Sequence, residues 1–124
     1  MAENSIWQFI AERERLNDLV LEKGGKNIKR FFNIDHNAYE PGALPKKTKE
    51  MLGLVASLVL RCDDCINYHL VQCHEQGVSG EELEEILTVG LVVGGSITIP
   101  HLRRAFRAWS ELDSGDPADG AKPE

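Results

Sequence analysis

Residues 46–60 place apolar side chains around nearly the whole circumference of a helix, and this segment most constrains how the chain can fold. Its apolar residues are Met51, Leu52, Leu54, Val55, Leu58, Val59 and Leu60. A helix that is apolar all round must be covered on most sides by other elements. Pro45 suits the first turn, where a backbone N–H has no partner within the helix. We therefore expect a central helix surrounded by other helices.

The N-terminal segment is expected to form an amphipathic helix. Asn4 or Ser5 can cap its start, and Gly24 and Gly25 can end it. One side of this helix is apolar and carries Ile6, Phe9, Ile10, Leu16, Leu19 and Val20. The spacing predicts a helix of moderate length that packs through this side.

Residues 26–44 have a different composition, rich in Asn, Asp, Gly and Pro. This composition favours one short helical turn around Phe31 and Phe32, followed by a loop. We expect Phe31, Phe32 and Tyr39 to lie in the core or in a contact between subunits, rather than around a small apolar ligand pocket.

Two more helices are predicted in the C-terminal half. Ser79-Gly-Glu-Glu82 is a capping box, and the helix after it has an apolar inner face of Leu83, Ile86, Leu87, Gly90 and Leu91. Gly90 and Gly94 either permit a close approach between helices or mark the end of this helix. A final helix is expected from about Ile97 or Pro100 to Leu112, with Leu102, Ala105, Phe106 and Trp109 facing inward.

The length indicates one domain, over residues 1–112, and the helical segments predicted along it give an all-α fold of about five to six helices. Residues 113–124 are rich in Gly, Pro, Ala and charge, which predicts a disordered tail. The net charge of −6 gives no basic surface for nucleic acid. No stretch has the composition of a signal peptide or a membrane span, so we expect a cytoplasmic protein that binds neither membranes nor nucleic acids.

The segment Cys62-Asp-Asp-Cys65-Ile-Asn-Tyr-His69 carries the groups needed for thiol redox chemistry. Side chains three and four residues apart share one face of a helix, so Cys65 lies next to both Cys62 and His69. A thiol near a helix N-terminus is acidified by the unpaired N–H groups there. Asp63 and Asp64 act in the opposite direction, because their charge disfavours a nearby thiolate.

Glu50 can join these groups only if the chain turns back on itself. In one straight helix Glu50 and Cys62 would be about 18 Å apart, at 1.5 Å per residue. Asp63 and Asp64 are good N-cap residues for a new helix, and a reversal near Arg61 would bring Glu50 close to His69. In that arrangement Glu50 orients the imidazole, His69 acts as the base, and Cys65 is the activated nucleophile.

Other readings of these residues are open. A zinc site could use Cys62, Cys65 and His69, with Cys73, His74, Glu50 or water as a further ligand. Cys62 and Cys73 are about 16 Å apart along one helix, however, so a single helix cannot supply all the ligands. We therefore expect no bound metal or cofactor. Cys73 and His74 are interpreted as packing or surface residues, and His101 as a surface residue that could alternatively lie at the entrance of the site.

The pattern Glu50, Cys62-x-x-Cys65 and His69 resembles the alkylhydroperoxidase D-like branch of the carboxymuconolactone decarboxylase superfamily. The resemblance covers roughly residues 30–110 and includes the segment from Gly90 to His101. It implies an all-helical bundle, a homo-oligomer such as a hexamer built as a trimer of dimers, and thiol peroxidase or disulfide reductase activity. By this resemblance Cys65 would attack peroxide, and Cys62 would then form a disulfide with the oxidised Cys65. Glu50 and His69 would relay protons.

Three functional hypotheses follow. The first is a thiol peroxidase or disulfide oxidoreductase that acts on a small hydroperoxide or disulfide. It would be restored by an external dithiol, such as one of lipoyl or thioredoxin type. The second is a lactone decarboxylase, the lyase activity for which the superfamily is named. The third is a homo-oligomer whose thiols sense redox state without catalysis.

Overall fold

The computed structural model describes residues 5–117, in which six α-helices and no strand are present. The helices are α1 (Ile6–Lys23), α2 (Lys26–Ala38), α3 (Lys46–Leu60), α4 (Asp63–Glu75), α5 (Gly80–Gly94) and α6 (Ile99–Ser114). The short 3₁₀ helix η2 (Ser96–Thr98) joins α5 to α6. The predicted all-α fold is therefore confirmed. No helix within the described range is both long and apolar enough to cross a membrane.

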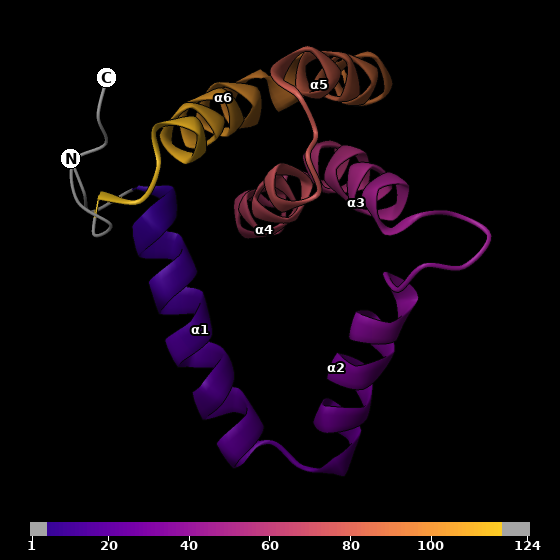
Figure 1. Cartoon of the computed structure of the whole chain (residues 1–124), viewed down its shortest axis with the longest axis vertical. Helices are drawn as coiled ribbons and strands as arrows, with labels where there is room; N and C mark the ends of the chain where they lie inside the picture. The colour runs from indigo at the N-terminus through magenta and orange to yellow at the C-terminus, as the bar shows by residue number, and fades with distance from the viewer. Residues whose placement is uncertain (1–4, 118–124) are drawn as a thin grey trace.

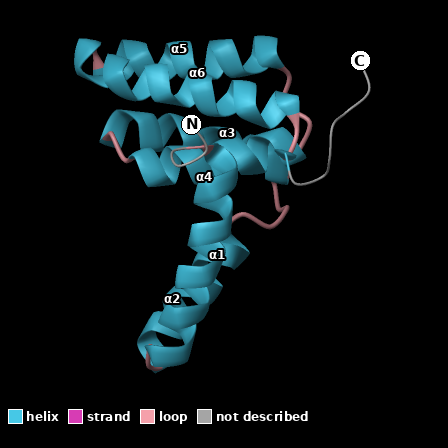
Figure 2. Cartoon of the chain, turned by 90° about the vertical axis from the view of Figure 1, so that its left-hand side faces the viewer, coloured by secondary structure: helices cyan, strands magenta, loops and turns pink. Residues whose placement is uncertain are grey.

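Helices α3 to α6 form the body of the molecule (Figures 1 and 2). Helix α3 packs against α4 and α5, and α4 also packs against α6. The core between them contains Leu54, Leu58, Ile66, Leu70, Leu83, Leu87, Ala105 and Trp109. Gly90 allows α5 to approach α3 closely, because a Cβ there would lie only 2.7 Å from a methyl group of Leu58. The capping box of Ser79 and Glu82 is present as predicted.

The chain reverses between α3 and α4 at the predicted place. Arg61 ends α3 in the left-handed conformation with a φ of 59°. The backbone N–H of Cys62 donates to the carbonyl of Ser57 at 3.2 Å. Helix α4 then begins at Asp63, and its N-cap is Cys62 rather than either aspartate. The reversal lays the motif helix back against the central helix.

Helices α1 and α2 form a V whose apex points away from the body (Figure 1). The start of α1 is fixed to α6 of the body, because Ile6 is buried and its N–H donates to Glu111 Oε1 at 2.8 Å. The prediction of a single helical turn around Phe31 and Phe32 is wrong, because α2 is a regular helix of 13 residues, whereas the predicted loop is present between α2 and α3. None of its residues is buried within this chain. The polar residues that suggested a loop lie on a helix surrounded by solvent on most sides.

Three other expectations need correction. Leu52 and Leu60 are exposed, so α3 is covered by α4 and α5 but not on all sides. Phe106 is 41% exposed, and Ala108 takes an inward position instead. Helix α6 continues to Ser114, two residues beyond the predicted end at Leu112, and His74 Nε2 lies 2.9 Å from Asp113 Oδ1. Asp113 and Ser114 of the predicted tail are thus helical, and residues 118–124 lie outside the described part of the chain.

Candidate active site

Cys62 and Cys65 form a disulfide at the first turn of α4. Cys65 is exposed, whereas Cys62 is partly buried. The backbone N–H of Cys65 donates to the sulfur of Cys62 at 3.2 Å, which places Cys62 in the N-cap position. In the reduced protein this contact and the helix dipole favour negative charge on the Cys62 sulfur. One sulfur is thus accessible and the other is held by the helix end.

Glu50 and His69 meet as predicted from the reversal at Arg61. His69 Nδ1 lies 2.9 Å from Glu50 Oε1, and both residues are buried. Glu50 Oε2 has no hydrogen bond among the described residues, and Lys46 Nζ lies 3.7 Å from it. A carboxylate buried in this way must be compensated by nearby positive charge or by donors. His69 therefore supplies the main polar partner of Glu50.

Gly53 makes room for this pair, a role that sequence reasoning missed. The His69 ring lies so close to the α3 backbone that a Cβ on Gly53 would be 2.6 to 2.9 Å from three ring atoms. Gly53 follows Glu50 by three residues and therefore lies on the same face of α3. A glycine in an otherwise apolar helix was the available signal, because such a residue often marks a close approach.

Both tyrosines of the chain contact the His69 ring. Tyr39, at the C-cap of α2, places its hydroxyl 3.5 Å from His69 Nε2, at the long end of hydrogen-bond distances. Tyr68 packs edge-on with a ring centroid distance of 5.0 Å. Burial, followed by the charges of Glu50 and Asp35, raises the pKa of Tyr39 above its usual range. Tyr39 therefore keeps its proton at neutral pH, and its expected role as a purely core or subunit-contact residue was too limited.

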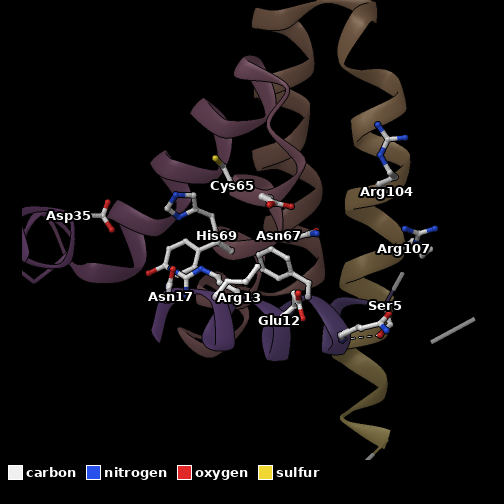
Figure 3. Close-up of a pocket in the computed structure, with 15 residues that line it drawn as sticks. Ser5, Glu12, Arg13, Asn17, Asp35, Cys65, Asn67, His69, Arg104 and Arg107 are labelled. Carbon is white, nitrogen blue, oxygen red and sulfur yellow. Dashed lines mark hydrogen bonds between the residues drawn. The ribbon is translucent and has the colours of Figure 1, made fainter. Parts of the chain in front are cut away.

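The contact predicted between His69 and Cys65 is not a direct hydrogen bond in this oxidised form. Among residues 5–117, His69 bonds to Glu50 and Tyr39 rather than to sulfur. Both His69 and Cys65 nevertheless line one open cavity of about 1010 Å³. Its wall is built from α1, α4 and α6, with Asp35 contributed by α2 (Figure 3). The imidazole and the exposed sulfur thus share one solvent-accessible space.

Asp63, between the cysteines, is held by two groups on α6. His101 Nδ1 lies 2.7 Å from one carboxylate oxygen, and Arg104 Nε donates to the other at 2.9 Å. His101 thus contacts the residue that follows Cys62, and it is not among the residues that line the cavity of Cys65 and His69. The arginine also offsets the negative charge that was expected to disfavour a thiolate.

Cys73 and His74 lie away from this group. Cys73 is in the hydrophobic core, and burial raises the pKa of its thiol to about 12. His74 packs against Trp109 and lies 2.9 Å from an Asp113 oxygen. The interpretation of both as packing or surface residues agrees with this placement. Within the described range, no cluster of three or more His, Cys, Asp or Glu side chains is arranged to hold a metal ion.

Comparison with known proteins gives a consistent match. The profile of the carboxymuconolactone decarboxylase family matches residues 27–111. An uncharacterised protein of Cupriavidus necator is 26% identical over 84 residues, which are 68% of this chain and 74% of that protein. Uncharacterised protein 4 in the cox locus of Paracoccus denitrificans is 24% identical over 83 residues, or 67% of this chain and 75% of that protein.

Solved structures extend the match to the whole fold. A crystal structure of TM1620 from Thermotoga maritima has a TM-score of 0.84 and 54% identity over 93% of this chain and 97% of its own. TM1620 is a carboxymuconolactone decarboxylase family protein for which an antioxidative role has been suggested. The Legionella pneumophila family protein lpg0406 shares the fold, with a TM-score of 0.79 and 22% identity over 86% of this chain and 96% of its own.

Proposed function

The chain belongs to the carboxymuconolactone decarboxylase family, and we propose that it is a thiol-dependent peroxidase or disulfide oxidoreductase. The observation that carries this proposal is the exposed Cys65 sulfur, bonded to a Cys62 sulfur at a helix N-terminus and sharing a cavity with His69. Glu50 and His69 supply the proton relay. The suggested antioxidative role of the similar Thermotoga maritima protein points in the same direction.

The oxidising half of the cycle begins with reduced protein and a small hydroperoxide. The Cys65 thiol gives its proton to His69, and the resulting thiolate attacks the terminal oxygen of the hydroperoxide. The O–O bond breaks, and the departing alkoxide takes a proton to become an alcohol. Cys65 is left as a sulfenic acid. Cys62 then attacks the Cys65 sulfur, the disulfide forms, and water leaves.

The reducing half of the cycle uses an external dithiol of lipoyl or thioredoxin type. One thiolate of this reductant attacks the exposed Cys65 sulfur, and the Cys62 thiolate leaves. A more acidic thiol leaves faster, so the N-cap contact of Cys62 favours this step. The second thiol of the reductant then breaks the mixed disulfide and releases Cys65, which is protonated through His69. Because the cycle depends on a supply of reduced dithiols, we place the protein in the cytoplasm.

We further propose that the protein works as a homo-oligomer, with a hexamer built as a trimer of dimers as the expected form. The V of α1 and α2 exposes Leu16, Leu19, Ile28, Phe31 and Ile34. On the body, exposed apolar side chains on α3, on α5 and in η2 are Leu52, Leu60, Val89, Val92, Val93 and Ile97. Surfaces of this kind mark contacts with other chains. Sedimentation equilibrium should give the mass of six 13.8 kDa chains, and a monomer would contradict the proposal.

The function is tested by measuring hydroperoxide and disulfide consumption in the presence of a dithiol. Wild-type protein should turn over and Cys65→Ser should lose turnover. Cys62→Ser should turn over more slowly, because its Cys65 sulfenic acid must wait for the external dithiol, and without dithiol it should stop after one oxidation. Unchanged turnover in Cys65→Ser would contradict the mechanism. Lactone decarboxylation that survives thiol alkylation would support the lyase instead. A reversible disulfide without turnover on any peroxide or disulfide would support a redox sensor.

A further inference from the structure

The two nitrogens of His69 face different partners from different helices. Nδ1 lies 2.9 Å from Glu50 Oε1 on α3, whereas Nε2 faces the Tyr39 hydroxyl at the end of α2. Sequence reasoning brought Glu50 and His69 together but assigned no role to Tyr39 in the site. The Tyr39 hydroxyl is the only group among the described residues that hydrogen-bonds to Nε2.

The protons of this chain of contacts can be assigned from chemistry. Tyr39 is protonated at neutral pH because burial and nearby carboxylates raise its pKa. Its O–H can therefore donate to Nε2, which must then carry a lone pair. The remaining proton of neutral His69 lies on Nδ1 and is donated to Glu50. Nε2 is consequently the nitrogen that carries the lone pair, and it can take a proton from a thiol when the Tyr39 hydroxyl turns so that its oxygen accepts from Nε2–H.

We propose that Tyr39 is a positioning residue that holds His69 Nε2 ready for proton exchange with the sulfur pair. This inference rests on the proposed function, in which His69 is the base. A hydroxyl suits both states of the ring. It donates to Nε2 when His69 is neutral, and its oxygen accepts from Nε2–H after His69 has taken a proton.

Protonated His69 is stabilised more by the Tyr39 hydroxyl than neutral His69 is. A hydrogen bond from a charged donor is stronger than one between neutral groups. Tyr39 therefore favours the thiolate and imidazolium pair over the neutral thiol and imidazole. Without the hydroxyl, the thiolate should form at a higher pH.

Other charged and titratable groups surround His69 and must be held constant in any test. They are Glu50 and Lys46 on α3, Cys65 and Tyr68 on α4, Asp35 on α2, and Arg13 on α1, whose guanidinium lies over the Tyr68 ring. Tyr39→Phe changes none of these groups and preserves ring packing against His69. Tyr68→Phe is the matched control, because Tyr68 also contacts the ring but has no hydroxyl contact with its nitrogens.

The experiment measures the alkylation rate of reduced protein by iodoacetamide as a function of pH. Tyr39→Phe should lower the rate at pH 7 by about fivefold and move the half-maximal rate to higher pH. Tyr68→Phe should keep the pH profile of wild-type protein. A Tyr39→Phe profile identical to wild type, or the same shift in both variants, would overturn the proposal. Because alkylation needs no peroxide or disulfide, the test remains valid if the proposed enzymatic activity is absent.

A second measurement covers the case in which Tyr39→Phe does not fold. Nitrogen-15 NMR of the oxidised wild-type protein distinguishes which ring nitrogen of His69 carries the proton. The inference predicts the proton on Nδ1 at neutral pH. Neutral His69 with its proton on Nε2 would overturn it.

Discussion

Two carboxylate and imidazole pairs flank the sulfur pair, and they differ in burial more than in geometry. Glu50 and His69 lie 2.9 Å apart with side chains that are 0% and 10% exposed. Asp63 and His101 lie 2.7 Å apart, but their side chains are 41% and 19% exposed. The closer pair is therefore the more solvated one, and Arg104 shares it.

We infer that burial, rather than distance, decides how much each pair contributes to the free energy of unfolding. Water screens an exposed charge when its partner is removed, so such pairs contribute little to stability. A buried carboxylate that loses its partner has no such screening. We infer that the Glu50 pair fixes the structure of the site, whereas the Asp63 pair adjusts the charge around the sulfurs.

The largest expected effect is that of His69→Leu, which leaves the Glu50 carboxylate buried with only Lys46 near it. Removing one partner of a buried pair costs about 3–5 kcal/mol of unfolding free energy. The matching change His101→Leu should cost about 0–1 kcal/mol because its partner Asp63 is partly exposed and keeps Arg104. Urea unfolding of both variants at pH 7 measures the difference. Equal losses of unfolding free energy in His69→Leu and His101→Leu would contradict the claim that burial separates the two pairs.

Gly53→Ala should have the next largest effect, and it acts on the buried pair alone. Alanine gains about 1 kcal/mol in helix propensity over glycine. Its Cβ would, however, lie within 3 Å of the His69 ring and force it away from Glu50. We expect a net loss of about 1–3 kcal/mol, typical of overpacking. Gly80→Ala is the control, since a Cβ there meets nothing within 4 Å; a stabilised Gly53→Ala protein would contradict the account.

A smaller effect is expected from Asp63→Asn, which tests the exposed pair. The loss of stability should be about 0.5–1 kcal/mol. Arg104, freed from its partner, should favour the thiolate and raise the reduction potential of the sulfur pair by about 10–20 mV. Asp64→Asn removes the same charge without freeing Arg104, so it should shift the potential less. Redox titration against glutathione measures both variants, and a fall in potential for Asp63→Asn would oppose this role.

The smallest expected effect is that of Cys73→Ala on thiol chemistry. Burial raises the pKa of Cys73 to about 12, so this thiol stays protonated and should resist iodoacetamide at pH 8 in folded protein. Mass spectrometry of reduced, folded protein should find label on Cys62 and Cys65 only. Because the pKa of the Cys73 thiol is raised in the folded protein, the stability linked to the protonated thiol is present below pH 9. This stability is lost as the pH rises towards 12. Urea unfolding above pH 9 should therefore show a weaker pH dependence in Cys73→Ala than in wild type.

The contrast between the two pairs also shows what sequence reasoning could reach. Spacing along a helix and the need for a turn near Arg61 were enough to bring Glu50 to His69. The contacts of Asp63 with α6 depend on how two helices pack, which no local pattern encodes. His101 was consequently given a surface role, and Tyr39 none in the site.

Helix α2 was missed for a related physical reason. Its polar residues are typical of loops, and its apolar residues Phe31 and Ile34 are 68% and 65% exposed in this chain. The spacing of Ile28, Phe31 and Phe32 is helical, but the Asn and Asp residues around them are typical of loops and outweighed it. Gly53 in an apolar helix indicates a close approach, but no local pattern tells that the approaching group is the His69 ring.

The central claim is that the buried Glu50 and His69 pair controls the reactivity of the exposed sulfur, and one rate measures it. Reduced wild-type protein should consume one equivalent of tert-butyl hydroperoxide as Cys62 and Cys65 join. Glu50→Gln, which keeps the size of the side chain and removes its charge, should react more slowly by about tenfold or more. A Glu50→Gln protein that forms the disulfide at the wild-type rate would contradict the account.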